Sequence, residues 1–253
     1  MNDNAIEAER HGPVLVLRMA DAAHRNVLSQ NLLSQLAHGF AVAEQDEGTR
    51  VVILAGLPDV FSLGASREAL LAFTEGADVS RAESAVSAPM RCALPVVASI
   101  RGHAISGGLL LGMYADIAVL SDRSCYGSNF MRYGICPMAG ATHVLGARLG
   151  DFLANEMLLT ARNYQGSELR RRGAPVEVVG HDDVEGRVMA IAKQMASAPR
   201  RSLVLLKRHR TAQLQAAVCE AYAHEVTTFE TLMALPETRR RIEADYPTWA
   251  GER

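Results

Sequence analysis

The sequence predicts an α/β protein with a helical C-terminal region. Short apolar runs alternate with segments of helical periodicity through the first half of the chain, and the last quarter is helical almost throughout. Strands followed by helices in this order are typical of a sheet covered by helices. The chain has 253 residues, of which 49% are hydrophobic and 21% charged. This is an ordinary globular composition, and a chain of this length can bury a large core.

The first part of the chain alternates strand and helix. Residues 13–20, PVLVLRMA, are a short β-rich run and form the first predicted strand. Residues 28–46 have apolar side chains at helical spacing, and Ser29 is a suitable N-cap for this helix. Residues 50–56, RVVILAG, are an apolar run that ends in glycine, which indicates a buried strand.

The middle of the chain repeats the same order. Residues 60–73, VFSLGASREALLAF, contain a small-residue turn that opens a helix. Residues 94–102 form a strand after a proline, and residues 105–121 contain a glycine turn, an apolar helix and a further strand. Residues 125–130, CYGSNF, are predicted to be another short strand.

The second half of the chain changes character. Residues 140–172 have a helical pattern, and residues 174–180 are predicted to be a strand or an extended arm. From Val184 onward the pattern is helical, with interruptions at Pro199 and Pro236, because proline breaks a helix interior. The sequence contains no linker, low-complexity segment or repeat.

We divide the chain into two parts on this basis. Residues 1–195 form the predicted α/β core. Residues 196–253 form the helical C-terminal region, which we expect to pack on the core or on a neighbouring subunit.

Charge and cysteine content exclude several classes of function. The net charge of −2 gives no reason to expect a nucleic-acid or anionic-membrane partner. The polar N-terminus is no signal peptide, and no apolar run reaches the roughly 18 residues that span a bilayer. The cysteines are widely spaced and form no CxxC pair, so we expect no structural metal site, no disulfide framework and a reducing, cytoplasmic location. They are Cys92, Cys125, Cys136 and Cys219.

Two small-residue turns are the candidates for chemistry. Residues 64–66, GAS, and residues 106–108, SGG, each follow a predicted strand and open a helix. The first turn of a helix has unpaired N–H groups that favour an anion. Either turn alone is a common structural feature. If the two converge, their N–H groups form an oxyanion hole that stabilises a developing negative charge. Neither turn matches a dinucleotide or P-loop pattern.

These turns lie within segments that resemble the crotonase, or enoyl-CoA hydratase/isomerase, superfamily. The segments are VFSLGAS, RGHAISGGLLLGMYADIAVLS and YGSNFMRYGICPMAGATHVL, and the resemblance extends over about residues 13–245. It implies a crotonase-like spiral of ββα units, assembled as trimers or pairs of trimers. It also implies that the N–H groups of Ala65 and Gly107 hold a thioester oxygen as it becomes an enolate.

The sequence departs from the hydratases of this superfamily at two positions. Those enzymes resemble this chain but carry two glutamates that deliver water across a double bond. The first glutamate position is here Leu110, and the second, placed in the strand before GICP, is here Phe130. Addition of water needs paired carboxylates, so we do not expect hydration. Leu110, Phe130 and Phe73 are instead expected to line the substrate pocket.

A narrower resemblance is to the decarboxylases of polyketide β-branching. It is carried by NFMRYGICPMAGAT, by GHAISGGLLLGMYADIAVLS, by PRRSLVLLKRH and by AHEVTTFE. It implies that 3-methylglutaconyl-ACP is converted to 3-methylcrotonyl-ACP through a dienolate. The implied partner is an acyl carrier protein of a polyketide synthase. The acyl group is carried on phosphopantetheine of that protein, or on CoA, and no further cofactor is implied.

The same resemblance supplies the remaining candidate residues. It places His224 near the substrate carboxylate, where it would bind that group or protonate the dienolate. Some members of the subgroup have a lysine where this chain has Phe73, and a tyrosine where it has Ala69. Arg67 or Arg81 is left as a partner for the carboxylate, and the proton donor is unassigned.

Two other functions fit the same residues. One is an acyl-CoA isomerase or another thioester enzyme of this fold. The other is a non-catalytic family member that binds a carrier protein, which the missing glutamates and lysine favour. The two intact turns argue for an enzyme, because a scaffold has no need of them.

Overall fold

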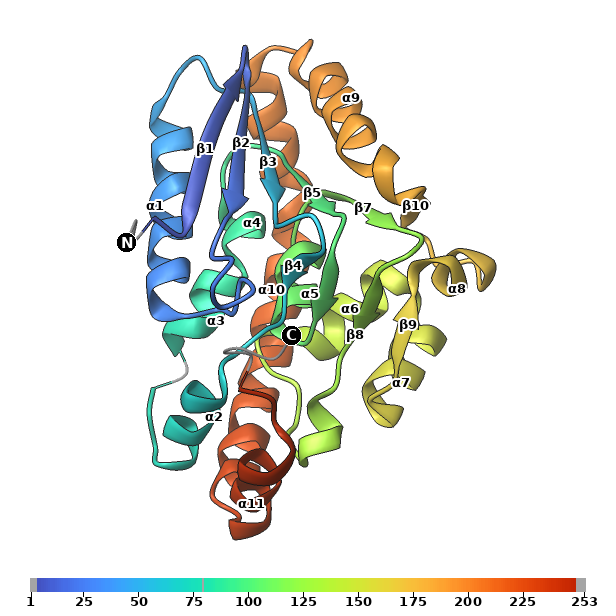
Figure 1. Cartoon of the computed structure of the whole chain (residues 1–253). Coiled ribbons are helices and arrows are strands. Elements are labelled where there is room, and N and C mark those ends of the chain that lie inside the picture. The colour runs from blue at the N-terminus through green and yellow to red at the C-terminus, as the bar shows by residue number, and fades with distance from the viewer. Residues whose placement is uncertain (1–3, 79, 249–253) are drawn as a thin grey trace.

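The strands of the protein form two sheets, seen in Figure 1. The computed structural model describes residues 4–78 and 80–248. The larger sheet has the strand order β1-β2-β3-β5-β7-β10, and the smaller sheet has the order β4-β6-β8-β9. β1 pairs antiparallel with β2, β9 pairs antiparallel with β8, and the other pairings are parallel. The strands are β1 Ile6–His11, β2 Val14–Met19, β3 Val51–Ala55, β4 Val60–Ser62, β5 Val96–Ile100, β6 His103–Ile105, β7 Ile117–Ser121, β8 Cys125–Gly127, β9 Asn163–Gln165 and β10 Glu177–Val179.

From β3 to β8, successive strands enter the two sheets alternately. β3, β5 and β7 belong to the larger sheet, and the strand that follows each of them, β4, β6 or β8, belongs to the smaller sheet. A helical segment follows each such pair of strands. The repeated unit is therefore ββα, and the predicted α/β fold class and ββα spiral are confirmed.

The helices cover both sheets and extend beyond them. They are α1 Gln30–Gln45, α2 Arg67–Thr74, α3 Ser80–Val86, α4 Ala88–Arg91, α5 Gly107–Met113, η1 Phe130–Tyr133, α6 Ala141–Leu149, α7 Asp151–Thr160, α8 Gly166–Arg171, η2 His181–Asp183, α9 Val184–Ala196, α10 Arg200–Met233 and α11 Pro236–Asp245. Ser29 caps α1 as predicted, because its side chain accepts from the Leu32 N–H. Among the described residues, no helix is both long and apolar enough to cross a bilayer.

Alternating side chains of the larger sheet divide the core in two. Val14 and Val16 of β2 face the same layer as Val51 of β3, and α9 covers this layer. Leu15 and Leu17 point to the opposite face, where α1 and α5 pack. Both faces of these parallel strands are therefore buried, as their continuous apolar sequences predict.

Three sequence-based assignments need correction. β9 interrupts residues 140–172, which we predicted to be helical; it has only three residues and depends on pairing with β8. The strand predicted over residues 125–130 ends at Gly127, and Phe130 begins the 3₁₀ helix η1. β1 was not predicted because four of its six residues are exposed and its sequence, IEAERH, is mostly polar.

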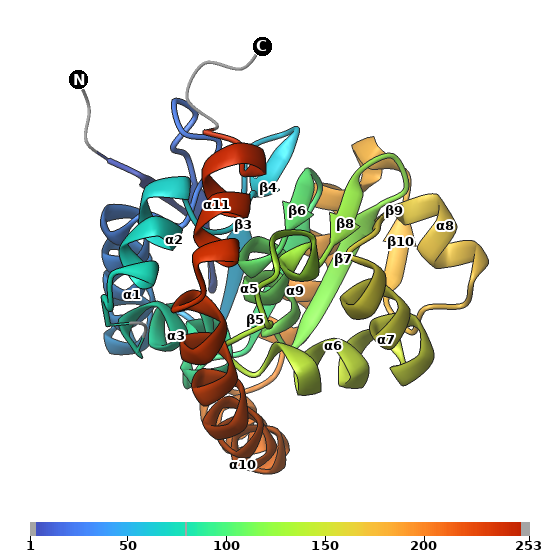
Figure 2. The same ribbon diagram turned by 90° about the horizontal axis from the view of Figure 1, so that it is seen from below.

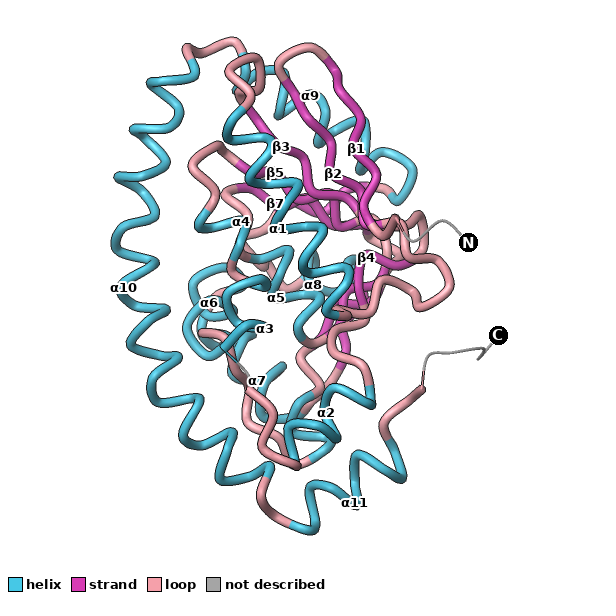
Figure 3. Tube along the Cα trace, turned by 90° about the vertical axis from the view of Figure 1, so that its left-hand side faces the viewer, coloured by secondary structure: helices cyan, strands magenta, loops and turns pink. Residues whose placement is uncertain are grey.

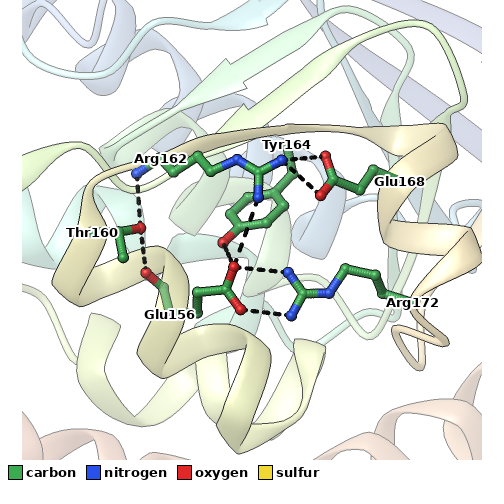
Figure 4. Close-up of polar contacts among 6 residues, drawn as sticks. All are labelled: Glu156, Thr160, Arg162, Tyr164, Glu168 and Arg172. Carbon is green, nitrogen blue, oxygen red and sulfur yellow. Dashed lines mark hydrogen bonds and ion pairs between the residues drawn. The ribbon is translucent and has the colours of Figure 1, made fainter.

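Polar contacts around Tyr164 hold β9 against α7 and α8 (Figure 4). The Tyr164 hydroxyl donates to Glu156 at 2.8 Å, and the Arg162 guanidinium lies 4.6 Å from the centre of the Tyr164 ring. Arg172 donates to both oxygens of Glu156 and holds the pKa of that carboxyl at about 2. Arg162 in turn pairs with Glu168 of α8. A three-residue strand is thus held by side chains as well as by its ladder.

The long helix α10 runs along one side of the molecule, and α11 folds back at its end (Figure 3). Glu225 of α10 is buried, and its carboxylate accepts from the N–H groups of Gly140 and Thr142 at 2.6 and 2.8 Å. These are orphan donors at the start of α6, where a negative charge is favourable. The contact ties α10 to the loop that precedes α6.

The imidazole of His103 in β6 makes the fold sensitive to acid. Its Nδ1 accepts from the Cys125 N–H at 2.9 Å, which needs an unprotonated nitrogen. Burial lowers the pKa of His103, and the nearby Arg25 lowers it further. Because the unfolded chain binds the proton more readily, the free energy of unfolding falls as the pH drops below about 6.5 toward the folded-state pKa.

We therefore expect thermal stability to fall between pH 7.5 and 5.5, and to fall less in His103→Gln, whose amide oxygen can accept the same bond. The measurement is the melting temperature of both proteins across this range. An equal loss in the two proteins would exclude His103 as the source.

Candidate active site

Parallel pairing of β4 with β6 brings the two small-residue turns together. The ladder joins Val60 to His103 and Ser62 to Ala104, so both strands end at the same edge of the smaller sheet. A Cβ atom built on Gly64 would lie 3.0 Å from the Ile105 carbonyl oxygen and 3.2 Å from the Gly107 nitrogen. The turns therefore touch through their backbones, and glycine at position 64 permits the contact.

The Ala65 and Gly107 N–H groups are free to bind a ligand. Neither group has an acceptor within the part of the chain that the structure describes. The carbonyl of Gly64, in the same peptide unit as the Ala65 N–H, accepts from Leu28 at 2.8 Å. Ser106 has a positive φ of 56°, and its N–H donates to the Gly127 carbonyl at 2.8 Å, which holds the backbone that precedes the Gly107 N–H. Two neighbouring backbone donors without an acceptor are what an oxyanion hole requires.

A cavity of about 100 Å³ opens onto these donors. Ala65 and Gly107 line it, together with all three residues predicted as apolar lining, Phe73, Leu110 and Phe130. The Phe73 ring packs edge-to-face on Phe229 of α10, with 5.9 Å between the ring centres. The remaining lining side chains are mostly apolar: Leu28, Leu33, Ala69, Leu70, Val86, Ile135, Met138 and Ala139. The cavity thus combines two backbone donors with a largely apolar wall.

Two polar side chains of the wall were not predicted. Glu83 of α3 is buried, its carboxylate pairs with the Arg91 guanidinium at 2.8 and 3.0 Å, and it accepts from the Ser87 hydroxyl at 3.2 Å. Tyr246, just beyond α11, donates its hydroxyl to the Ala65 carbonyl oxygen at 2.9 Å. Neither role could be predicted from the sequence, since both depend on helices that reach the cavity from distant parts of the chain.

The structure does not bring Arg67 to the cavity. Its guanidinium donates to the backbone carbonyls of Ile242, at 3.3 Å, and of Glu243, both at the end of α11. Two of its guanidinium nitrogens thus join α2 to α11, and Arg67 is not among the residues that line the cavity. The side chain of Arg81 lies outside the described residues.

His224 also lies away from the cavity. It is exposed on α10, whereas its neighbour Glu225 is buried against α6. One residue along an α-helix is a rotation of about 100°. The buried stripe of this helix contains Val218, Glu225 and Phe229, so His224 points away from the core. The motif AHEVTTFE therefore brings Phe229 into the wall of the cavity, but not His224.

A spiral of ββα units with two converging backbone donors beside an apolar cavity defines the crotonase class of proteins. The chain belongs to the enoyl-CoA hydratase/isomerase family, whose family model matches residues 9–249. The resemblance found in the sequence is confirmed at this level.

Individual relatives show which members of this family the chain resembles. The chain is 34% identical, over 94% of its length and 96% of the relative, to the bacillaene synthase decarboxylase PksI of Bacillus subtilis. It is 36% identical to the solved ECH2 decarboxylase domain of CurF from Lyngbya majuscula, with a TM-score of 0.89 and coverage of 96% and 99%. A structure of a dehydratase/decarboxylase enzyme couple involved in polyketide beta-branching matches with a TM-score of 0.92, 34% identity and coverage of 96% and 99%. The predicted similarity to this subgroup is also confirmed.

Proposed function

We propose that the protein is a decarboxylase of polyketide β-branching that converts 3-methylglutaconyl-ACP to 3-methylcrotonyl-ACP. The observation that carries this proposal is the pair of unpartnered N–H groups, Ala65 and Gly107, at an apolar cavity with Leu110 and Phe130 at the glutamate positions. Those side chains cannot activate water, whereas the two donors can stabilise the negative charge that develops on a thioester oxygen. The similarity to PksI and to the CurF domain supports the same reaction.

In the proposed reaction, the bond between the γ carbon and the carboxylate breaks and CO₂ leaves. The electron pair moves through the conjugated double bond onto the thioester oxygen, which gives a dienolate. The N–H groups of Ala65 and Gly107 bind that oxygen and stabilise its charge. A proton from the solvent then adds to the γ carbon and completes 3-methylcrotonyl.

The apolar wall assists the loss of CO₂ in this scheme. Phe73, Leu110 and Phe130 exclude water from the space around the acyl chain. The exclusion of water destabilises a compact carboxylate more than a charge that is spread over a dienolate. The free energy of the charged substrate therefore rises relative to that of the intermediate.

The test is direct turnover of the proposed substrate. Synthetic 3-methylglutaconyl-ACP is incubated with the purified protein, and the mass of the acyl-carrier protein is followed. We expect the loss of the mass of one CO₂, faster from the carrier-protein thioester than from the corresponding CoA thioester. An intact acyl group after prolonged incubation would overturn the proposal.

Glu83 favours a second candidate function, that of an acyl-CoA isomerase. An isomerase needs one base, and Glu83 is a carboxylate at the cavity that pairs with Arg91 at 2.8 Å. The two functions are distinguished with an enoyl-CoA in D₂O. Deuterium incorporation with a shifted double bond, without turnover of 3-methylglutaconyl-ACP, would identify the isomerase.

We expect His224→Ala to leave kcat and KM within about twofold of wild type, because substitution of an exposed side chain far from the cavity has little effect. Phe229→Ala is the matched variant on the same helix, and it removes a ring from the cavity wall. Steady-state turnover of both variants is measured. A loss of kcat in His224→Ala as large as that in Phe229→Ala would show that His224 acts in the active site.

We also propose that the protein assembles as a trimer or a pair of trimers. Phe152 and Leu159 of α7 are 93% and 77% exposed, and their spacing of seven residues places them on one face of the helix. An exposed apolar face of this kind is typical of a subunit contact. Light scattering of the purified protein, with Phe152→Asp as the disrupting variant, tests the assembly.

A further inference from the structure

The C-terminal helix α11 ends directly at the first oxyanion turn. α2 and α11 lie side by side in Figure 2, and they are in contact. Tyr246 follows the last residue of α11 and is only 7% exposed. Its ring packs on Tyr133 of η1, with 4.7 Å between the ring centres, and its hydroxyl donates to Ala65. The ring contact thus fixes the place from which the hydroxyl reaches the turn.

A second contact joins the same two segments in the opposite direction. Arg67, two residues beyond Ala65, donates to the Ile242 and Glu243 carbonyls. These carbonyls lie at the carboxyl end of α11, where a cation is favourable, and the Ile242 carbonyl also accepts from the Tyr246 N–H at 3.2 Å. Tyr246, just after α11, therefore binds the Ala65 carbonyl, and the Arg67 side chain binds the end of α11.

These contacts determine the direction of the Ala65 N–H. A residue's N–H belongs to the peptide unit before it, and its carbonyl belongs to the unit after it. Leu28 binds the first unit through the Gly64 carbonyl, and Tyr246 binds the second through the Ala65 carbonyl. With both units held, rotation about the two soft backbone dihedrals of Ala65 is restricted. The N–H is then oriented before any substrate binds, which is how an oxyanion hole avoids a reorganisation cost.

We propose that Tyr246 is a positioning residue, which acts through its hydrogen bond to Ala65 to hold the first oxyanion donor in place, with Arg67 keeping α11 at that turn. The inference rests on the proposed function, since it is the formation of a dienolate that gives the Ala65 N–H its role. It assigns to the C-terminal helix a part in the active site that the sequence motifs do not indicate.

The experiment compares Tyr246→Phe with Tyr133→Phe in the full-length protein. Each variant loses one hydroxyl from the same pair of rings, but the Tyr133 hydroxyl makes no hydrogen bond to another described residue. We expect kcat for 3-methylglutaconyl-ACP to fall about three- to tenfold in Tyr246→Phe, with KM nearly unchanged, because one neutral hydrogen bond is lost. Tyr133→Phe is expected to retain wild-type kcat.

A double-mutant cycle separates positioning from a general loss of stability. In a Gly64→Ala background, where the donors are already displaced, adding Tyr246→Phe is expected to lower kcat by less than about twofold. Equal kcat in Tyr246→Phe and Tyr133→Phe would overturn the inference, and so would two effects that multiply independently. Absence of turnover by the wild-type protein would instead count against the proposed function.

Discussion

Gly64→Ala is expected to lower kcat for 3-methylglutaconyl-ACP by on the order of 10²–10³, the effect of losing one oxyanion donor. Gly64 has a φ of +83°, and its Cβ would lie 3.1 Å from the Ser106 Cβ and 3.2 Å from the Gly107 nitrogen. These atoms are backbone or close to it, so they cannot move aside as a flexible side chain can. The added methyl group therefore separates the two turns, and the N–H groups no longer converge on one oxygen.

Gly76→Ala is the matched control for this substitution. Gly76 lies just beyond α2 with a φ of +87°, and a Cβ there would meet nothing within 4 Å. Both variants carry the same left-handed strain, which costs about 1–2 kcal/mol of stability. Only Gly64→Ala also wedges the turns apart, so we expect Gly76→Ala to keep wild-type kcat. Equal losses of kcat in the two variants would show that strain, and not donor geometry, accounts for the effect.

The backbone part of the site could be predicted from sequence because it depends on local patterns. Small residues after short apolar runs indicate strand–turn–helix units, and the structure places both turns at one sheet edge. The three apolar lining residues, Phe73, Leu110 and Phe130, were also predicted, and all line the cavity. Even so, Phe130 lies in a 3₁₀ helix and not in the expected strand, because the ladder with β6 ends at Gly127.

The side chains whose positions could not be predicted from the sequence belong to helices whose rotation depends on tertiary packing. His224 and Glu225 are adjacent in sequence, but only Glu225 faces the core, where the loop before α6 offers N–H donors. Glu83 and Tyr246 reach the cavity from α3 and from beyond α11, two segments with no motif of their own. Arg67 is near the donors in sequence, yet its guanidinium is engaged by α11. A residue that is close to the donors in the sequence therefore does not have to point its side chain into the cavity.

The structure explains why one of the few lysines of this chain is a lysine and not an arginine. The chain has 26 basic residues, and only Lys193 and Lys207 are lysines. Lys207 of α10 has a side chain that is 3% exposed, and its ammonium donates to the carbonyls of Pro89 and Leu94 at 2.7 and 2.9 Å. It also pairs with Asp116 at 2.9 Å. Three acceptors match the three N–H donors of an ammonium, whereas the planar fork of a guanidinium suits a carboxylate.

Lys207→Met is therefore expected to lower the free energy of unfolding by about 3–5 kcal/mol. Methionine keeps much of the apolar stem but leaves the Pro89 and Leu94 carbonyls without the ammonium donor. The Asp116 carboxylate loses its cation and keeps only the Val96 N–H as a donor. Those groups join α10 to α4, to the segment before β5 and to the residue before β7, so the loss falls on the packing of α10. The measurement is equilibrium unfolding in urea. Lys193→Met is the control, since Lys193 is exposed on α9 and we expect a change within about 0.5 kcal/mol. Similar unfolding midpoints for the two variants would mean that the Lys207 ammonium contributes no more than a surface charge.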